Sequence, residues 1–242
     1  MTARRFFVEG RQQDGDSVTI DGSDARKIER VLRLRRGDRI EIVDSAARAF
    51  SASIDHVGRV VRARLLEPLA EGHAGAALGI EVAQAVPKGR RMDFVVEKCT
   101  ELGAVSFQPF YSERSVGRES GHEKLARWRR LARNAARQCG RRDIPEVRDP
   151  LEVRTLFERF GEYDAVLFAW ELAEPIALRR RLSSLPEAGR VLVVIGPEGG
   201  FTHAEADAAI AHGATVVSLG PRVLRTDTAA VALLAVIGAL SS

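Results

Sequence analysis

The sequence has few cysteines and no long apolar run, and both absences restrict what the protein can be. Its two cysteines, Cys99 and Cys139, lack CxxC spacing, and no two of its five histidines stand four residues apart as helical metal ligands do. We therefore expect neither a disulfide framework nor a metal site. The longest apolar run, Ala229 to Leu240, is shorter than the roughly 20 residues that span a bilayer, so we expect no membrane association. Arg4 and Arg5 are not followed by the apolar segment of a signal peptide, which favours a cytoplasmic location.

Several catalytic motifs are also missing. The chain has neither the GxSxG turn of serine hydrolases nor the GxxxxGK[ST] loop of P-loop NTPases. The glycine-rich turn at 196–200 is not GxGxxG, and no acidic residue follows about 20 positions later to hold a ribose. These absences argue against serine hydrolases, P-loop NTPases and nicotinamide oxidoreductases.

The charge of the chain is unevenly distributed. With 45% hydrophobic and 29% charged residues, the composition is that of a globular protein with a formal net charge of +4. Between Arg114 and Arg142, however, ten basic residues accompany only two acids, a local charge of +8. Such a concentration of basic residues is typical of a polyanion-binding surface.

The first 70 residues are predicted to form a small β-barrel with one short helix, Asp24–Arg33, whose Ile28, Val31 and Leu32 share one face. The predicted strands are short, rich in alternating apolar residues and separated by turn signals: Arg5–Glu9, Ser17–Ile20, Asp38–Val43, Ala49–Ile54 and Val60–Leu66. We assign residues 1–72 to this domain and residues 73–79, in a stretch rich in small side chains, to a linker.

Strands and helices alternate in the rest of the chain, residues 80–242. Predicted strands are Ile80–Val86, Val105–Phe110, Asp164–Ala169, Arg190–Ile195 and Thr215–Leu219. Predicted helices are Arg91–Leu102, Gly121–Gln138, Leu151–Phe160, Thr202–His212 and Thr226–Leu240. This alternation indicates an α/β domain with a parallel sheet covered on both faces, whose ligand would bind beyond the carboxyl ends of the strands.

Two strand-end loops, Gly196–Gly200 and Leu219–Leu224, each contain Gly-Pro. Pro197 and Pro221 stiffen the loops, and the glycines allow the backbone to approach a ligand closely. Such loops suit a ligand recognised by backbone groups against apolar walls, for example an adenine and a thioether. Two ordinary proline-containing turns are the alternative.

The motifs in these loops resemble those of a known family. Gly196-Pro-Glu-Gly-Gly-Phe201, followed by Leu219-Gly-Pro-Arg-Val-Leu-Arg-Thr-Asp-Thr-Ala229, resembles the signature of the RsmE-type ribosomal RNA uridine N3-methyltransferases of the SPOUT superfamily. Supporting motifs occur along both domains: Arg4-Arg-Phe-Phe, Val31-Leu-Arg-Leu-Arg-Arg-Gly-Asp38, Lys88-Gly-Arg-Arg-Met-Asp93, Glu97-Lys-Cys-Thr-Glu-Leu-Gly103, Arg114-Ser-Val116 and Asn134-Ala-Ala-Arg-Gln-Cys-Gly-Arg141. The chain departs from the family at Asp227, where Glu is usual, and at about Lys27, where His is common.

The resemblance implies a PUA-like RNA-binding barrel, a C-terminal domain with a trefoil knot within about 164–240, and a homodimer. It also implies methyl transfer from S-adenosylmethionine to N3 of a uridine in 16S ribosomal RNA of the small subunit. The cofactor residues implied lie in and beside the two loops: Ala169, Glu171, Ile195, Gly196, Pro197, Glu198, Gly199, Gly200, Leu219, Gly220, Arg222, Val223 and Leu224.

Uracil N3 carries a proton, so catalysis needs a base or a cation that stabilises charge developing on the carbonyl oxygens. We expect Arg225 to be that cation and Arg222 to be the second candidate, while Asp227 or Glu198 takes the proton or orients an arginine. Asp227 could instead serve only the N-terminus of the last helix. No metal is required, because a sulfonium already makes its methyl group electrophilic.

The arginines of the barrel and of the basic helix are candidates for RNA contact, although solvated faces would have similar sequences. The RNA-binding residues that we expect are Arg4, Arg5, Arg33, Lys88, Arg91, Arg114, Arg130, Arg133 and Arg137. The last helix is apolar nearly all round, which favours cover by a second subunit over burial within one chain. The alternative functions are methylation of another RNA nucleotide and a non-catalytic role as an RNA-binding assembly factor.

Overall fold

The computed structural model describes residues 4–69, 78–116, 121–173, 182 and 185–240. The chain divides into two compact units: Met1–Ala74 with Arg137–Asp143, and Gly75–Ala136 with Ile144–Ser242. Most of the predicted linker at 73–79 lies outside the described residues. Within the described ranges, no helix is long and apolar enough to cross a membrane.

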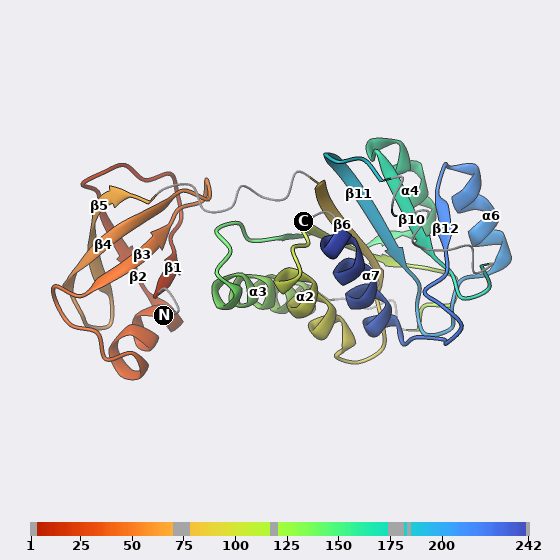
Figure 1. The fold of residues 1–242 in the computed structure, drawn as a ribbon. Coiled ribbons are helices and arrows are strands. Elements are labelled where there is room, and N and C mark those ends of the chain that lie inside the picture. The colour runs from red at the N-terminus through yellow and green to blue at the C-terminus, as the bar shows by residue number, and fades with distance from the viewer. Residues whose placement is uncertain (1–3, 70–77, 117–120, 174–181, 183–184, 241–242) are drawn as a thin grey trace. The chain divides into compact units, whose positions relative to one another are not determined.

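The first unit is a curled five-stranded sheet (Figure 1). Its strands, in their order across the sheet, are β1 (Arg5–Phe7), β3 (Arg39–Val43), β4 (Ala49–His56), β5 (Val61–Pro68) and β2 (Ser17–Ile20). Among its described residues, β1 and β3 pair in parallel and the other pairings are antiparallel. Alternate residues such as Val18 and Ile20 point into a core that also contains Phe6, Ile42 and Ile54. The predicted strands are confirmed to within about two residues at most ends.

The predicted helix Asp24–Arg33 is wrong in its second half. The α-helix α1 covers only Gly22–Arg26, and a π-helical turn, η1, follows over Lys27–Val31. In this turn the Leu32 N–H donates to the Lys27 carbonyl, one residue further back than in an α-helix. The wider turn rotates Val31 away from the core. Ile28 is fully buried as predicted, whereas Val31 is 71% exposed.

The second unit is built on a parallel sheet, as predicted. Six strands run in the order β12 (Thr215–Val217), β10 (Ala165–Ala169), β11 (Gly189–Ile195), β6 (Leu78–Ala85), β7 (Ser106–Tyr111) and β8 (Glu146–Val147), while β9 (Leu151–Glu152) also pairs with β7. Every pairing found in the described part of this sheet is parallel. The carboxyl ends of β10, β11 and β12 therefore meet at one edge.

Helices cover both faces of the parallel sheet (Figure 1). One core combines α2 (Arg91–Glu101), α3 (His122–Cys139) and α7 (Thr226–Leu240) with Val191, Val193 and Ile195 of β11. A second core places the intervening Leu192 and Val194 against α4 (Val153–Glu158) and α6 (His203–Ala211). Because successive strand side chains point to opposite faces, the continuous apolar run of β11 serves both cores.

One predicted helix of this unit, Leu151–Phe160, is shorter in the structure. Leu151 and Glu152 pair with β7 as β9, the helix α4 ends at Glu158, and a 3₁₀ turn, η2, covers Phe160–Glu162. The preceding two-residue strand β8 lies beside β7 and has no apolar period long enough to be predicted. The trefoil knot expected within about 164–240 depends on the path through 174–181 and 183–184, which lie outside the described residues.

Candidate active site

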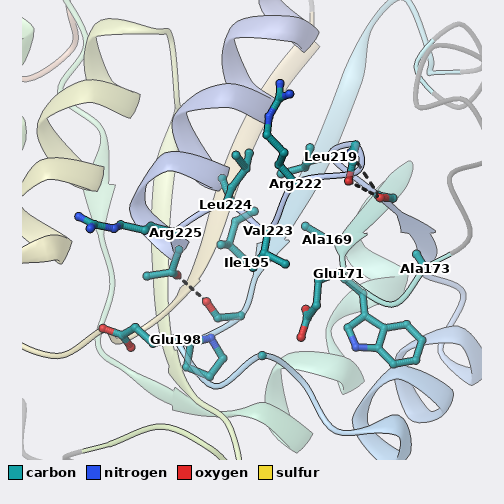
Figure 2. Close-up of a pocket in the computed structure, with 18 of the residues that line it drawn as sticks. Ala169, Glu171, Ala173, Ile195, Glu198, Leu219, Arg222, Val223, Leu224 and Arg225 are labelled. Carbon is teal, nitrogen blue, oxygen red and sulfur yellow. Dashed lines mark hydrogen bonds between the residues drawn. The ribbon is translucent and has the colours of Figure 1, made fainter.

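A cavity of about 440 Å³ opens at the carboxyl ends of β10, β11 and β12, where the two Gly-Pro loops meet (Figure 2). Its residues come from the ends of these strands, the two loops, and the first turns of α2 and α7. They are Arg91, Ala169, Trp170, Glu171, Ala173, Ile195, Gly196, Pro197, Glu198, Gly200, Ser218, Leu219, Gly220, Pro221, Arg222, Val223, Leu224, Arg225, Thr226 and Ala229. The cavity is therefore where the parallel sheet predicts a ligand.

The first loop, Gly196–Gly200, needs its glycines at two places. A Cβ on Gly196 would come within 2.9 Å of the Phe201 ring, which is buried beneath the loop. Gly200 has a left-handed φ of +66°, and a Cβ there would collide with the Glu171 carboxylate. That carboxylate points into the cavity (Figure 2). Backbone thus forms this wall, which lets a ligand approach it closely.

The helix that follows this loop begins with a capping box. The Thr202 hydroxyl accepts from the Glu205 N–H at 3.2 Å, and a Glu205 carboxylate oxygen accepts from the Thr202 N–H at 2.9 Å. The other Glu205 oxygen accepts from the Glu113 N–H at 2.9 Å. The adjacent Arg114 donates from Nη1 to the Gly199 carbonyl at 2.9 Å. The segment after β7 therefore holds the first loop from outside.

A hydrogen-bonded path joins the two loops to the sheet. The Thr226 hydroxyl, at the start of α7, donates to the Gly196 carbonyl at 2.5 Å. The same hydroxyl oxygen accepts from Nε2 of Gln84, a fully buried residue of β6, at 2.8 Å. Thr226 is itself buried, so water competes little for these bonds.

Glu198 connects the first loop to α2. Its Oε1 accepts from the Lys88 N–H at 3.0 Å and from the Arg91 guanidinium. Both bonds end on the same oxygen. Considering only the described chain, Oε2 has no hydrogen-bond partner, so this oxygen is available to a ligand or a proton.

Two cavity arginines, Arg222 and Arg225, are exposed and point in different directions (Figure 2). Arg225 extends on the side of the cavity where Glu198 lies, whereas Arg222 extends away from it along α7. Neither side chain has a hydrogen bond or ion pair to any described residue. Asp227 does not line the cavity, and its Oδ1 accepts from the Thr228 N–H at 3.0 Å in the first turn of α7.

The structure brings together most of the residues expected to bind a cofactor. Twelve of the thirteen line the cavity; Gly199 does not, and its carbonyl is bonded to Arg114 instead. Sequence reasoning missed Trp170, Ala173, Ser218, Pro221, Thr226 and Ala229, which also line it. Trp170 follows the apolar strand β10, and its buried indole N–H has no partner in the described parts of the chain.

The residues expected to bind RNA fall into distinct environments. Arg4, Arg33, Lys88, Arg130 and Arg133 are exposed, and Arg91 lines the cavity. Two others are engaged within the first unit: Arg5 forms an ion pair with Glu41 at 2.8 Å, and Arg137 forms one with Asp24. Their side chains are only 10% and 12% exposed.

The cavity lies within a domain that matches a known family. A family model described as an RNA methyltransferase domain matches residues 75–238. A ribosomal RNA small subunit methyltransferase E from Synechocystis is 35% identical over 98% of this chain and 78% of its own length. The chain belongs to the ribosomal RNA small subunit methyltransferase E family.

Two solved structures share the fold of nearly the whole chain. One is a methyltransferase from Legionella pneumophila in complex with the cofactor SAM, with a TM-score of 0.88, 31% identity, and coverage of 99% of this chain and 98% of that one. The other is a ribosomal RNA small subunit methyltransferase E from Neisseria gonorrhoeae bound to S-adenosyl methionine, with a TM-score of 0.86, 28% identity and 98% coverage of both chains. The family resemblance stated from the motifs is confirmed.

Proposed function

We propose that this protein transfers a methyl group from S-adenosylmethionine to N3 of a uridine in 16S ribosomal RNA, in the cytoplasm. The observation that carries this proposal is the cavity itself. Two Gly-Pro loops meet there at the carboxyl ends of parallel strands, and hydrogen bonds through Thr226 connect them to β6, which is distant from both in sequence. The family assignment and the cofactors of the two similar structures support it.

The cavity suits S-adenosylmethionine in size and in chemistry. Its volume lies within the range of small-molecule sites, roughly 300–1,000 Å³. Apolar side chains of Ile195, Leu219 and Leu224 offer surface for a flat base, and the bare backbone at Gly196 and Gly200 allows close approach. The Glu171 carboxylate supplies an acceptor for hydroxyl or ammonium groups. When bound, S-adenosylmethionine supplies an electrophilic methyl group on its sulfonium.

We assign the chemical roles to two side chains on one side of the cavity (Figure 2). As N3 of the uracil forms its bond to the methyl carbon, the N3 proton goes to Oε2 of Glu198 and the sulfur leaves as a neutral thioether. The Arg225 guanidinium stabilises the negative charge that develops on the uracil carbonyl oxygens. Arg91 holds the other oxygen of Glu198 and so orients the carboxylate. Asp227, outside the cavity, stabilises the start of α7.

Replacing Arg225 with Ala tests the assignment. We expect kcat for methyl transfer to fall by about 10²- to 10³-fold, since a preorganised charge donor is lost, while the Kd for S-adenosylmethionine changes little. Arg154→Ala, which removes an exposed arginine from α4, is the control and should behave as wild type. Wild-type turnover by Arg225→Ala would overturn the assignment.

Two further measurements separate the alternative functions. Mass spectrometry of ribosomal RNA from a deletion strain identifies the methylated base, and a base other than uridine would overturn the proposed substrate. Titration calorimetry with S-adenosylmethionine gives its affinity. The absence of binding would favour a non-catalytic assembly factor.

The exposed basic side chains support an RNA-binding surface. On α3, Arg130 and Arg133 have no partner among the described residues, whereas Arg127 on the same helix is paired with Asp93 at 2.6 Å. Arg91 lines the cavity, and the backbone N–H of Lys88 donates to Glu198, which also lines it. We propose that these cations, together with Arg4 and Arg33 of the first unit, contact the phosphates of the RNA.

We also propose that the protein is a homodimer. Large apolar side chains are exposed on α2 and α7, which pack together: Phe94 is 46%, Val236 40% and Leu240 57% exposed. A second subunit would cover such a surface. Light scattering should give twice the chain mass of 26.5 kDa for the wild type, and the mass of a single chain for Val236→Glu. Ile210→Glu on α6, with Ile210 51% exposed, is the control. A wild-type monomer would contradict the proposal.

A further inference from the structure

The buried amide of Gln84 is a feature that the roles above leave unexplained. Gln84 is in register with Ile195 of β11 on one side and with Pro109 of β7 on the other, in the middle of the parallel sheet. It is completely buried. A polar side chain in such a place lowers stability unless its hydrogen bonds are made.

The donors and acceptors along the hydrogen-bonded path from Gln84 can be assigned in only one way. The Gly196 carbonyl accepts but cannot donate, so the Thr226 hydroxyl must donate its single proton to that carbonyl. The hydroxyl oxygen must then accept the bond from the amide, which requires that the NH₂ group of Gln84 faces it. The second N–H of this group donates to the Ala85 carbonyl at 3.0 Å. The two ends of the path thus fix the orientation of the amide.

Stability alone does not account for a glutamine here. Its Oε1 is buried and has no hydrogen-bond partner within the described residues. A buried acceptor without a partner costs about 1–3 kcal/mol, and a leucine of similar size would avoid that cost. The amide makes two bonds that leucine could not make, one to the adjacent Ala85 and one to Thr226, and of these two only the bond to Thr226 reaches another element.

We infer that Gln84 is a positioning residue for the cofactor cavity. The inference rests on the proposed function, in which S-adenosylmethionine is the ligand. Gln84 does not line the cavity; it acts through Thr226 and Gly196, which do. By fixing the Thr226 hydroxyl, it holds the start of α7 and the first loop at one separation. The two walls of the cavity are then in place before the ligand arrives.

Titration calorimetry with S-adenosylmethionine tests the inference without relying on activity. Gln84→Leu should raise the Kd at least five-fold while the protein melts at or above the wild-type temperature. Thr226→Val, which breaks the path at its centre, should raise the Kd by a similar factor. Because both changes break the same path, the Kd of the double variant should lie within two-fold of the Kd of the weaker-binding single variant. Thr226→Ser keeps the hydroxyl and should bind within two-fold of wild type.

Gln108 provides a matched control on the neighbouring strand. It is equally buried, and its amide bonds to the Pro109 and Asp149 carbonyls and to Arg159, none of which lines the cavity. Gln108→Leu should lower the melting temperature and leave the Kd unchanged.

The results separate failure of the inference from failure of the proposed function. If wild type binds S-adenosylmethionine and Gln84→Leu binds within two-fold of it, Gln84 is not a positioning residue. The inference would also be overturned if the increases in Kd caused by Gln84→Leu and Thr226→Val multiplied in the double variant. An equal loss of affinity in Gln108→Leu would overturn it as well. If Gln84→Leu does not fold, the inference still requires that Thr226→Val binds S-adenosylmethionine more weakly than Thr226→Ser does. If wild type itself does not bind, the proposed function fails.

Discussion

At the scale of single residues, the cavity depends on where side chains are absent as much as on where they are present. Gly200 leaves room for the Glu171 carboxylate, and Gly196 leaves room for the Phe201 ring. Without Cβ atoms at these positions, the Glu171 carboxylate, from the segment after β10, and the Phe201 ring, from the residue that directly follows the loop, pack against the loop backbone. The residues packed around the first loop therefore determine its shape, and each of the two glycines is required by a different neighbour.

We expect Gly200→Ala to weaken S-adenosylmethionine binding at least ten-fold, measured by calorimetry, because the new methyl group would displace Glu171. The left-handed backbone also costs about 1 kcal/mol with alanine. Gly213→Ala is the matched control, since Gly213 is also left-handed, with φ +92°, and a Cβ there would meet nothing within 4 Å. Both variants should lose stability, and only the first should lose affinity. Equal affinities would show that Glu171 does not shape the site.

At the scale of elements, α3 combines two kinds of arginine on one helix. Leu125, Trp128 and Ala132 are buried in the core with α2 and α7, which fixes the helix on the sheet. Arg127 and Arg129 are used within the unit, by Asp93 and by the Val147 carbonyl. Arg130 and Arg133 remain for an external anion. An apolar stripe thus determines which of the basic residues face outward.

Exchanging both Arg130 and Arg133 for Gln should lower RNA affinity and make it less sensitive to salt. Each lost phosphate contact removes about 0.7–0.9 from the slope of log K against log salt, so the slope should fall by roughly 1.5. Filter binding over a range of salt concentrations measures both effects. Arg127→Gln, which removes a cation already paired with Asp93, should leave the slope unchanged. A wild-type slope in the double variant would exclude α3 from the RNA surface.

At the scale of the whole molecule, the parallel sheet is held at the ends opposite the cavity by one buried carboxylate. Glu81 on β6 accepts hydrogen bonds from Ser106, Tyr163, Arg148 and Arg190, at 2.6–3.1 Å for the closest contact of each. Burial alone would raise the pKa of Glu81, but the bonds from the arginines and Ser106 lower it to about 2 from an ordinary 4.5. The ionised group therefore stabilises the folded second unit.

This carboxylate should make the second unit sensitive to acid. A lowered pKa gives stability that is complete above pH 4.5 and is lost as the pH falls toward 2, about 3 kcal/mol in all. Urea unfolding at several pH values should show this loss for wild type and a flatter profile for Glu81→Gln, which starts less stable at pH 7. Glu158→Gln, an exposed site on α4, should follow wild type. If Glu81→Gln lost stability with falling pH as the wild type does, another group would be responsible for the acid sensitivity.

Local patterns predicted the parts of the fold that depend on neighbours in sequence. The helix that begins at Thr202, the apolar strand before Gly196 and the two glycine-proline loops could all be predicted, because capping, periodicity and backbone freedom act over a few residues. The π-helical turn that exposes Val31 was not readable, since it depends on how the turn packs in the first unit.

The contacts missed at the site share one property, a long separation in sequence. Arg114 lies in a basic run and was expected to bind RNA, yet it donates to Gly199, 85 positions away. Gln84 stands in an apolar strand with no motif around it, and its partner is 142 positions away. Composition and period carry no information about such pairs. The knot and the roles of the site residues toward ligand stay predictions.

The long path from Gln84 to Thr226 also has a consequence for the order in which the protein becomes competent to bind. Contacts between distant parts of a chain form late, because closing a long loop costs entropy before any contact compensates for it. The cavity needs β6, β11 and the start of α7 together, so it cannot exist while the second unit is only partly folded. Binding of the methyl donor should therefore appear only with the final cooperative phase of refolding of the second unit, and it reports completion of that unit.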